Sequence, residues 1–112
     1  MTRTTTDYPA FIKNFPRALL PDGSSGPFLI GGDKGQVVFH TIASGQAVSL
    51  HSHNDSWAII VSGSLEVTVG KEHFSAGTGM SWFIPEGVEH GGKAIDDSLL
   101  IEVFCEKRFS PA

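Results

Sequence analysis

The feature that most constrains the fold is a regular alternation of short β-rich runs and turn signals after Gly35. Glycine breaks the chain every few residues, as at 44–45, 62–63, 70–71 and 76–77, and no segment has the pattern of a helix linking parallel strands. Strands this short and this regularly spaced predict a β-sandwich or β-barrel. We expect strands near residues 37–42, 47–51, 57–62, 65–69, 72–75, 80–84 and 99–105.

The composition excludes several classes of protein. The chain has 112 residues, the length of one domain, and carries 12 acidic against 8 basic residues with no basic run to bind nucleic acid. Segment 1–7 lacks the apolar stretch of a secretory signal, and no apolar run reaches membrane-spanning length. We therefore expect a soluble, cytoplasmic protein without nucleic-acid or membrane partners. Cys105 is the single cysteine, which excludes an internal disulfide, and we expect it to be a buried apolar group.

The N-terminal segment 1–27 is irregular. Its four prolines recur too often for a long helix, and residues 22–27 have the composition of a loop. Apolar residues within 11–20 form either one short helical turn or an arm packed on the barrel or on a partner subunit. We predict an arm at 1–27 and a single barrel domain at 28–112. The arm's apolar side chains would be partly exposed in a monomer, so we expect a homodimer.

Three of the five histidines have an informative spacing. His51 and His53 are two residues apart at the end of a predicted strand, where alternate residues point to the same face. His90 follows a strand and a Pro-Glu-Gly turn, so a neighbouring strand can bring it to the same point. Three converging imidazoles form a common metal site with open coordination positions, although a histidine pair at this spacing also occurs by chance on surfaces.

The residues around these histidines resemble the two signature motifs of the cupin superfamily. Gly45 is followed by five residues, then His51-Ser-His53, with Gly63 closing the first motif; Gly79, Pro85, Gly87 and His90 match the second at every spacing. The resemblance runs from about residue 35 to 109 and is to the small single-domain bacterial cupins. It implies an all-β fold, a double-stranded β-helix or jelly-roll barrel, with the metal inside near one open end. Gly63 and Gly87 fall at tight turns, where a positive φ is often needed.

One ligand of the family motif is missing. Most cupins add a glutamate to the three histidines, but counting from Gly63 finds Ser56 there, and counting from His53 finds Trp57 or Ala58. Asp55 is the nearest acid and has the wrong strand phase for a ligand. Two alternatives stay open: a three-histidine centre with an extra free position, as in some cupin-like dioxygenases acting on thiols, diketones and gentisate-like rings, or loss of the metal.

Two further residues are candidates for catalysis. His40 enters the cavity as a general acid or base if Val38, His40 and Ile42 face inward; otherwise it is an exposed strand histidine. Glu102 alternates with Leu100 and Phe104, so it is either an inward catalytic carboxylate with a raised pKa or part of an outer face covered by a partner. His73 is expected to be exposed on a hairpin.

The sequence therefore predicts a metal-dependent cupin acting on a small organic acid or carbonyl compound, with His51, His53 and His90 as ligands. An Fe(II) dioxygenase is the favoured form, and a lyase or isomerase using Zn, Mn or Ni is the alternative. The same residues are also consistent with a small-ligand-binding cupin without turnover, or with a metal-free enzyme in which a histidine does the acid–base work.

Overall fold

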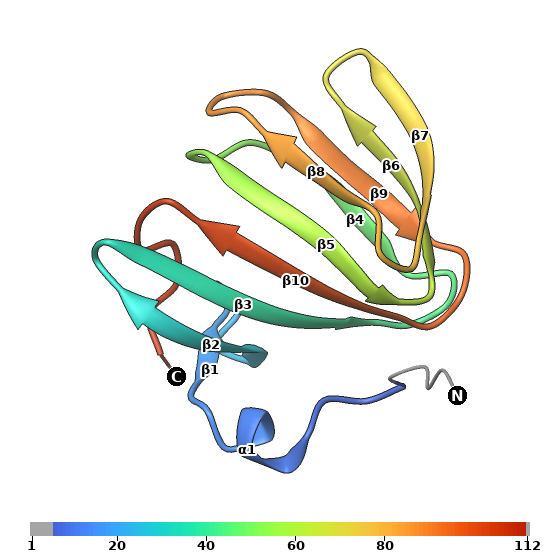
Figure 1. The fold of residues 1–112 in the computed structure, drawn as a ribbon. Helices are drawn as coiled ribbons and strands as arrows, with labels where there is room; N and C mark the ends of the chain where they lie inside the picture. The colour runs from blue at the N-terminus through green and yellow to red at the C-terminus, as the bar shows by residue number, and fades with distance from the viewer. Residues whose placement is uncertain (1–5, 112) are drawn as a thin grey trace.

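Two antiparallel β-sheets face each other in the computed structural model, which describes residues 6–111 (Figure 1). One short helix precedes the strands within these residues. The elements are α1 (Ala10–Lys13), β1 (Arg17–Leu19), β2 (Ser25–Gly32), β3 (Gly35–Ile42), β4 (Ala47–His51), β5 (Ser56–Ser62), β6 (Ser64–Val69), β7 (Glu72–Gly77), β8 (Ser81–Ile84), β9 (His90–Ala94) and β10 (Ser98–Phe104).

The strand order confirms the predicted all-β jelly-roll barrel. One sheet has the order β1-β2-β3-β10-β5-β8 and the other β4-β9-β6-β7, with every pairing antiparallel. The last strand, β10, therefore lies in the middle of the larger sheet, between β3 and β5. This position brings residues of β10 beside residues that are about 40 to 60 positions earlier in the chain, such as Glu102 beside Ala58 and Val38.

Strand alternation determines what faces the barrel interior. On β5, Ser56, Ala58 and Ile60 are buried, whereas Trp57 between them is 41% exposed. The buried apolar residues join one core cluster that spans both sheets. Its members are Ile42, Ala58, Ile60, Leu65, Val67, Ala76, Ala94 and Leu100.

All seven expected strands are present, and the structure has three further strands that were not predicted: β1, β2 and β9. The supposed loop at 22–27 overlaps the start of β2, and the supposed break at Gly91-Gly92 lies inside β9. A Cβ at Gly91 would lie 2.6 Å from the carbonyl oxygen of Val48, and one at Gly92 would collide with that of Glu66. These glycines let β9 lie close against β4 and β6, so they serve a strand rather than a turn. Gly63 and Gly87 do have positive φ, at +99° and +77°, as predicted.

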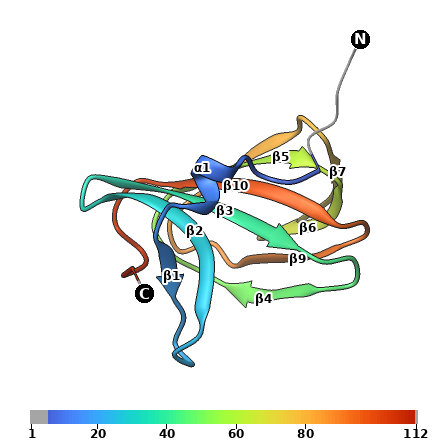
Figure 2. The same cartoon turned by 90° about the horizontal axis from the view of Figure 1, so that it is seen from below.

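The part of the N-terminal arm that precedes β1 lies against the outer face of its own large sheet (Figure 2). The rest of the predicted arm includes β1 and the start of β2, which are strands of that sheet. Tyr8 is buried, and its hydroxyl donates to the carbonyl oxygen of His40 at 2.7 Å and lies 3.2 Å from that of Leu100. Ile12 and Phe15 pack with Phe39 in the same cluster. The first five residues of the predicted arm lie outside the described residues.

The structure also bears on two further sequence expectations, the burial of Cys105 and the absence of a membrane-spanning segment. Cys105 is exposed rather than buried, because β10 ends at Phe104 and the next backbone N–H turns to the carbonyl of Asp55. Among the described residues, no helix has the length and apolar character that a membrane crossing requires.

Candidate metal centre

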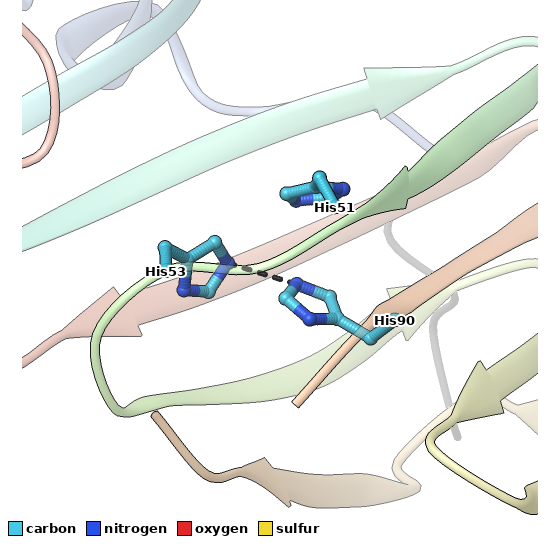
Figure 3. A group of neighbouring side chains, drawn as sticks. All are labelled: His51, His53 and His90. Atoms are coloured by element: carbon cyan, nitrogen blue, oxygen red, sulfur yellow. Dashed lines mark hydrogen bonds between the residues drawn. The ribbon is translucent and has the colours of Figure 1, made fainter. Parts of the chain in front are cut away.

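Three histidines meet at one end of the barrel (Figure 3). His51 ends β4, His90 begins β9, and the two residues are direct partners across the sheet. A register shift between Val48 and His51 bends β4 as it reaches the site. His53 lies just beyond β4, in the link to β5. One nitrogen from each ring lies within 4.8 Å of the others, so the convergence predicted from the spacing is present.

Each histidine is oriented by a carbonyl oxygen of the nearby backbone. Nδ1 of His51 lies 2.8 Å from the carbonyl oxygen of Ser49, Nδ1 of His53 2.7 Å from that of Asn54, and Nδ1 of His90 3.0 Å from that of Val88. A carbonyl oxygen only accepts hydrogen bonds, so each Nδ1 carries the proton. In the neutral rings, Nε2 then carries the free lone pair. Metal-binding histidines adopt this arrangement, with one nitrogen donating to a carbonyl oxygen and the other free to bind the metal.

The contact between His53 and His90 tests whether a metal fits. Their Nε2 atoms lie 2.8 Å apart. With both Nδ1 atoms protonated, two neutral rings would point lone pairs at each other, which is unfavourable unless a proton or a cation lies between them. Burial lowers the pKa of both histidines, so the added proton is disfavoured. The donor set therefore fits a divalent metal ion that accepts nitrogen ligands.

Glu102 brings a carboxylate to this centre from β10. It is 9% exposed, and its Oε2 lies 3.6 Å from Nε2 of His53. The Ser56 hydroxyl donates to the same oxygen at 2.9 Å. The motif position where a glutamate is expected thus holds a serine that binds a glutamate from the neighbouring strand.

The pKa of Glu102 differs from the sequence expectation. Burial raises it, but the adjacent His40, the Ser56 hydroxyl and His53 together outweigh burial, so the net pKa is below the ordinary value. The prediction of a raised pKa was wrong because it considered only desolvation. The partners that stabilise the carboxylate come from β3, β5 and the link after β4.

His40 lies on the far side of this carboxylate. Its Nε2 is 3.4 Å from Oε1 of Glu102 and has no hydrogen-bond partner among residues 6–111. The His40 ring therefore points toward the carboxylate rather than away from the barrel. Asp55 is exposed and accepts a hydrogen bond from the backbone of Glu86, which excludes it as a ligand in this conformation, and His73 is exposed as expected.

Arg108, which lies after β10, was not predicted from the sequence as a site residue. Its guanidinium carbon is 5.7 Å from the centroid of the Phe104 ring, and that ring packs edge-on against His53. Much of Arg108 is exposed at the rim of the site. The shielding of part of its guanidinium from water there lowers its pKa. No motif marks this arginine, and the only sequence signal is the basic pair Lys107-Arg108 after the last predicted strand.

Comparison with known proteins bears on both fold and site. A cupin domain family model matches residues 38–105. None of the curated proteins matches the chain. A cupin described as RmlC-like from Shewanella frigidimarina NCIMB 400 superposes with a TM-score of 0.76 at 19% identity, covering 95% of this chain and 96% of that one.

Two further similar solved structures have sequence identities of 25% or more. KdgF from Halomonas sp. has a TM-score of 0.68 and 25% identity over 71% of this chain and 76% of its own. Oxalate decarboxylase from Bacillus subtilis has a TM-score of 0.63 and 28% identity over 70% of this chain, which corresponds to 22% of that larger protein.

Proposed function

The chain belongs to the cupin domain family, and from that premise we propose that it is a metal-dependent enzyme that transfers protons on a small organic acid or carbonyl compound. His51, His53 and His90 hold the metal ion, and the reaction is that of a lyase or isomerase. The observation that carries this proposal is the buried carboxylate of Glu102, 3.6 Å from the metal-facing nitrogen of His53. A base in that position lies beside any substrate atom bound at the centre.

The chain's own groups can handle a proton. A divalent ion held by the three imidazoles supplies Lewis-acid polarisation of a substrate oxygen. Glu102 accepts the proton at its carboxylate, which is kept ionised by its neighbours. Ser56 fixes Oε2 by its hydrogen bond, and His40 lies 3.4 Å from Oε1, where it can take the proton onward.

One of the similar proteins supports this chemistry and names one metal. Oxalate decarboxylase from Bacillus subtilis contains Mn(II) centres and acts, by its name, on a small organic acid. Imidazole nitrogens also suit Fe, Zn and Ni. Manganese and iron are therefore the first ions to test.

An Fe(II) dioxygenase is the second candidate. It is favoured by the same serine: Ser56 stands at the motif's glutamate position, and its hydroxyl is engaged with Glu102, so the motif itself contributes three imidazoles. Such a centre keeps open positions for a bidentate substrate and dioxygen. The buried base favours proton transfer over the dioxygenase reaction.

The test uses untagged protein, with metal content measured before and after loading with Mn(II) or Fe(II). A panel of 2-oxo and 2-hydroxy acids is followed in D2O by NMR, with dioxygen uptake recorded in parallel. Proton exchange or elimination without dioxygen uptake supports the proposal, whereas uptake that requires iron favours the dioxygenase. Binding without any turnover would instead indicate a ligand-binding cupin.

Glu102→Gln sharpens this test. We expect metal content to be retained and turnover to fall about 100-fold or more, the usual contribution of a general base. Glu72→Gln is the matched control, because Glu72 is an exposed carboxylate at the start of β7 and borders neither the site nor the adjoining cavity. Full activity in Glu102→Gln would contradict the role assigned to Glu102.

A further inference from the structure

Two spaces of opposite character flank the metal centre. On the outer side lies a polar vestibule, in which two basic side chains face a single acidic one. Its lining residues are Ser52, His53, Asn54, Phe104, Glu106, Lys107 and Arg108. On the inner side, a cavity begins at His51, His90 and Glu102 and continues into the barrel. Both spaces reach the histidine cluster, the vestibule at His53 and the cavity at His51 and His90.

The inner cavity offers almost no polar partner beyond the site itself. Its walls come from both sheets and are apolar past the two histidines and Glu102. The apolar side chains are Ile42, Val48, Ala58, Leu65, Val67, Trp82, Ile84, Ala94 and Leu100. Glu66 and Lys93 also border it, but both are exposed and are cross-strand partners on β6 and β9.

The cavity is also small, with a volume of about 70 Å³. A water molecule needs roughly 10–15 Å³ of such volume, so the cavity holds about five to seven groups the size of a water or a methylene. Hydroxyl groups placed there would lose their hydrogen bonds to water and find few replacements. A hydrocarbon chain placed there has no hydrogen bonds to lose and gains van der Waals contact with the apolar walls.

We propose, on the basis of the function proposed above, that the substrate is a short-chain monocarboxylic acid with an apolar tail of about five carbons. The tail occupies the inner cavity, the reacting carbon and its oxygen lie at the histidines, and the carboxylate faces the vestibule near Arg108. Polyhydroxylated acids of similar length are rejected because their hydroxyl groups would be buried without partners.

The first experiment measures binding to the Mn(II)-loaded protein by calorimetry. The probes are acetate, butyrate, hexanoate and decanoate, with glucuronate as a hydroxylated acid of the same charge. We expect affinity to rise about fourfold per methylene as far as hexanoate, because burying a methylene contributes about 0.8 kcal/mol. Decanoate should not bind more tightly than hexanoate, and glucuronate should bind at least about tenfold more weakly.

Two variants change the cavity in opposite directions. Ala58→Leu fills it, and we expect hexanoate to bind at least about tenfold more weakly while acetate binding and manganese content are unchanged. Ala94→Val is the milder alternative if Ala58→Leu fails to fold, since both alanines are 1% exposed. Trp82→Ala enlarges the cavity and should move the preferred tail length upwards. Ala47→Leu, at an exposed position of β4, is the matched control and should leave the series unchanged.

The outcomes separate this inference from the proposed function. Affinity that does not depend on tail length, or tighter binding of glucuronate than of hexanoate, overturns the apolar-tail proposal and leaves the metal enzyme standing. A protein that retains no metal overturns the proposed function. Because the tail series can be repeated without metal, it still decides the character of the cavity in that case.

Discussion

Each face of the large sheet carries a few residues that depart from the usual arrangement of polar and apolar groups, although the inner face is otherwise an apolar core. The inner face buries Ser56 and Glu102, at 3% and 9% exposure, next to His40. The outer face exposes Trp57 at 41% and Phe83 at 57%. Buried polar groups add little stability and exposed aromatic groups cost solubility, so neither feature is explained by folding alone. The buried polar groups of the inner face belong to the proposed reaction, and for the exposed aromatic groups of the outer face we propose a contact with a second copy of the chain.

The outer face is itself divided into two parts. Phe39 is covered by the arm through Tyr8 and Phe15. The neighbouring row, formed in register by Val103, Trp57 and Phe83 on β10, β5 and β8, is left exposed by the arm. The sequence pattern favoured the arm as the dimer contact, and we now propose this row, which we call the outer apolar row, as the contact between two copies.

The largest effect should come from the inner face. His90→Ala should lower metal affinity by more than about 100-fold, because changes to groups that merely orient a ligand already cost about 10- to 100-fold. His51→Ala and His53→Ala should do the same, and His73→Ala, on an exposed hairpin, should not. Competition with a chelator gives the affinities. Unchanged metal content in His90→Ala would contradict the three-histidine metal centre.

The outer apolar row gives the next effect. Trp57→Lys should weaken a homodimer by about 30-fold or more, since a buried tryptophan at an interface is often worth about 2 kcal/mol or more. Light scattering at micromolar concentration measures this.

Phe11→Lys, which changes the arm at a residue that is 66% exposed, is the control and should leave the dimer intact. Dissociation by Phe11→Lys alone would return the interface to the arm. A monomeric parent protein would end the dimer proposal.

Features that follow from local patterns in the sequence could be predicted, whereas contacts that depend on the pairing of strands far apart in the sequence could not. His51, His53 and His90 follow from local spacing and strand phase, and so do the turns at Gly63 and Gly87. The contact of Glu102 with Ser56 requires β10 to lie beside β5, which no local pattern specifies. Strand β9 was missed for a related reason: Gly91 and Gly92 have the composition of a turn, and only the closeness of the Val48 and Glu66 backbones explains them.

The covered part of the outer face gives a pH-dependent effect of intermediate size. Burial raises the pKa of Tyr8 far above its ordinary value of about 10. The unfolded chain therefore releases this proton first, so the stability that Tyr8 contributes is present below about pH 10 and is lost as the pH rises above it. Tyr8 is the single tyrosine, so phenolate absorbance in an alkaline titration reports it alone.

Tyr8→Phe keeps the packing of the ring but removes the hydroxyl. We expect it to lower the free energy of unfolding by about 1 kcal/mol at neutral pH, the ordinary value of one hydrogen bond. It should also abolish the part of the alkaline destabilisation that begins near pH 10. An alkaline profile identical to that of the parent would mean that Tyr8 does not hold the arm.

The smallest effect concerns Ser56. Ser56→Ala removes one hydrogen bond to a carboxylate that His40 still faces, so the free energy of unfolding should change by about 1–2 kcal/mol or less and metal content should not change. Turnover should fall less than in Glu102→Gln, because the base remains present but is less well held. Loss of metal from Ser56→Ala would indicate that Ser56 faces the ion instead of Glu102.

The central position of β10 has a consequence for biosynthesis. Of the described strands this one leaves the ribosome last, yet it supplies the middle of the large sheet and the carboxylate of the site. Until it inserts, β3 and β5 each have an unpaired edge, and such edges can pair with other chains. We therefore expect the nascent protein to be prone to aggregation until β10 joins the sheet, because folding dominated by such distant pairings is slow. Substitutions that weaken β10 should reduce the yield of soluble protein more than their effect on final stability suggests.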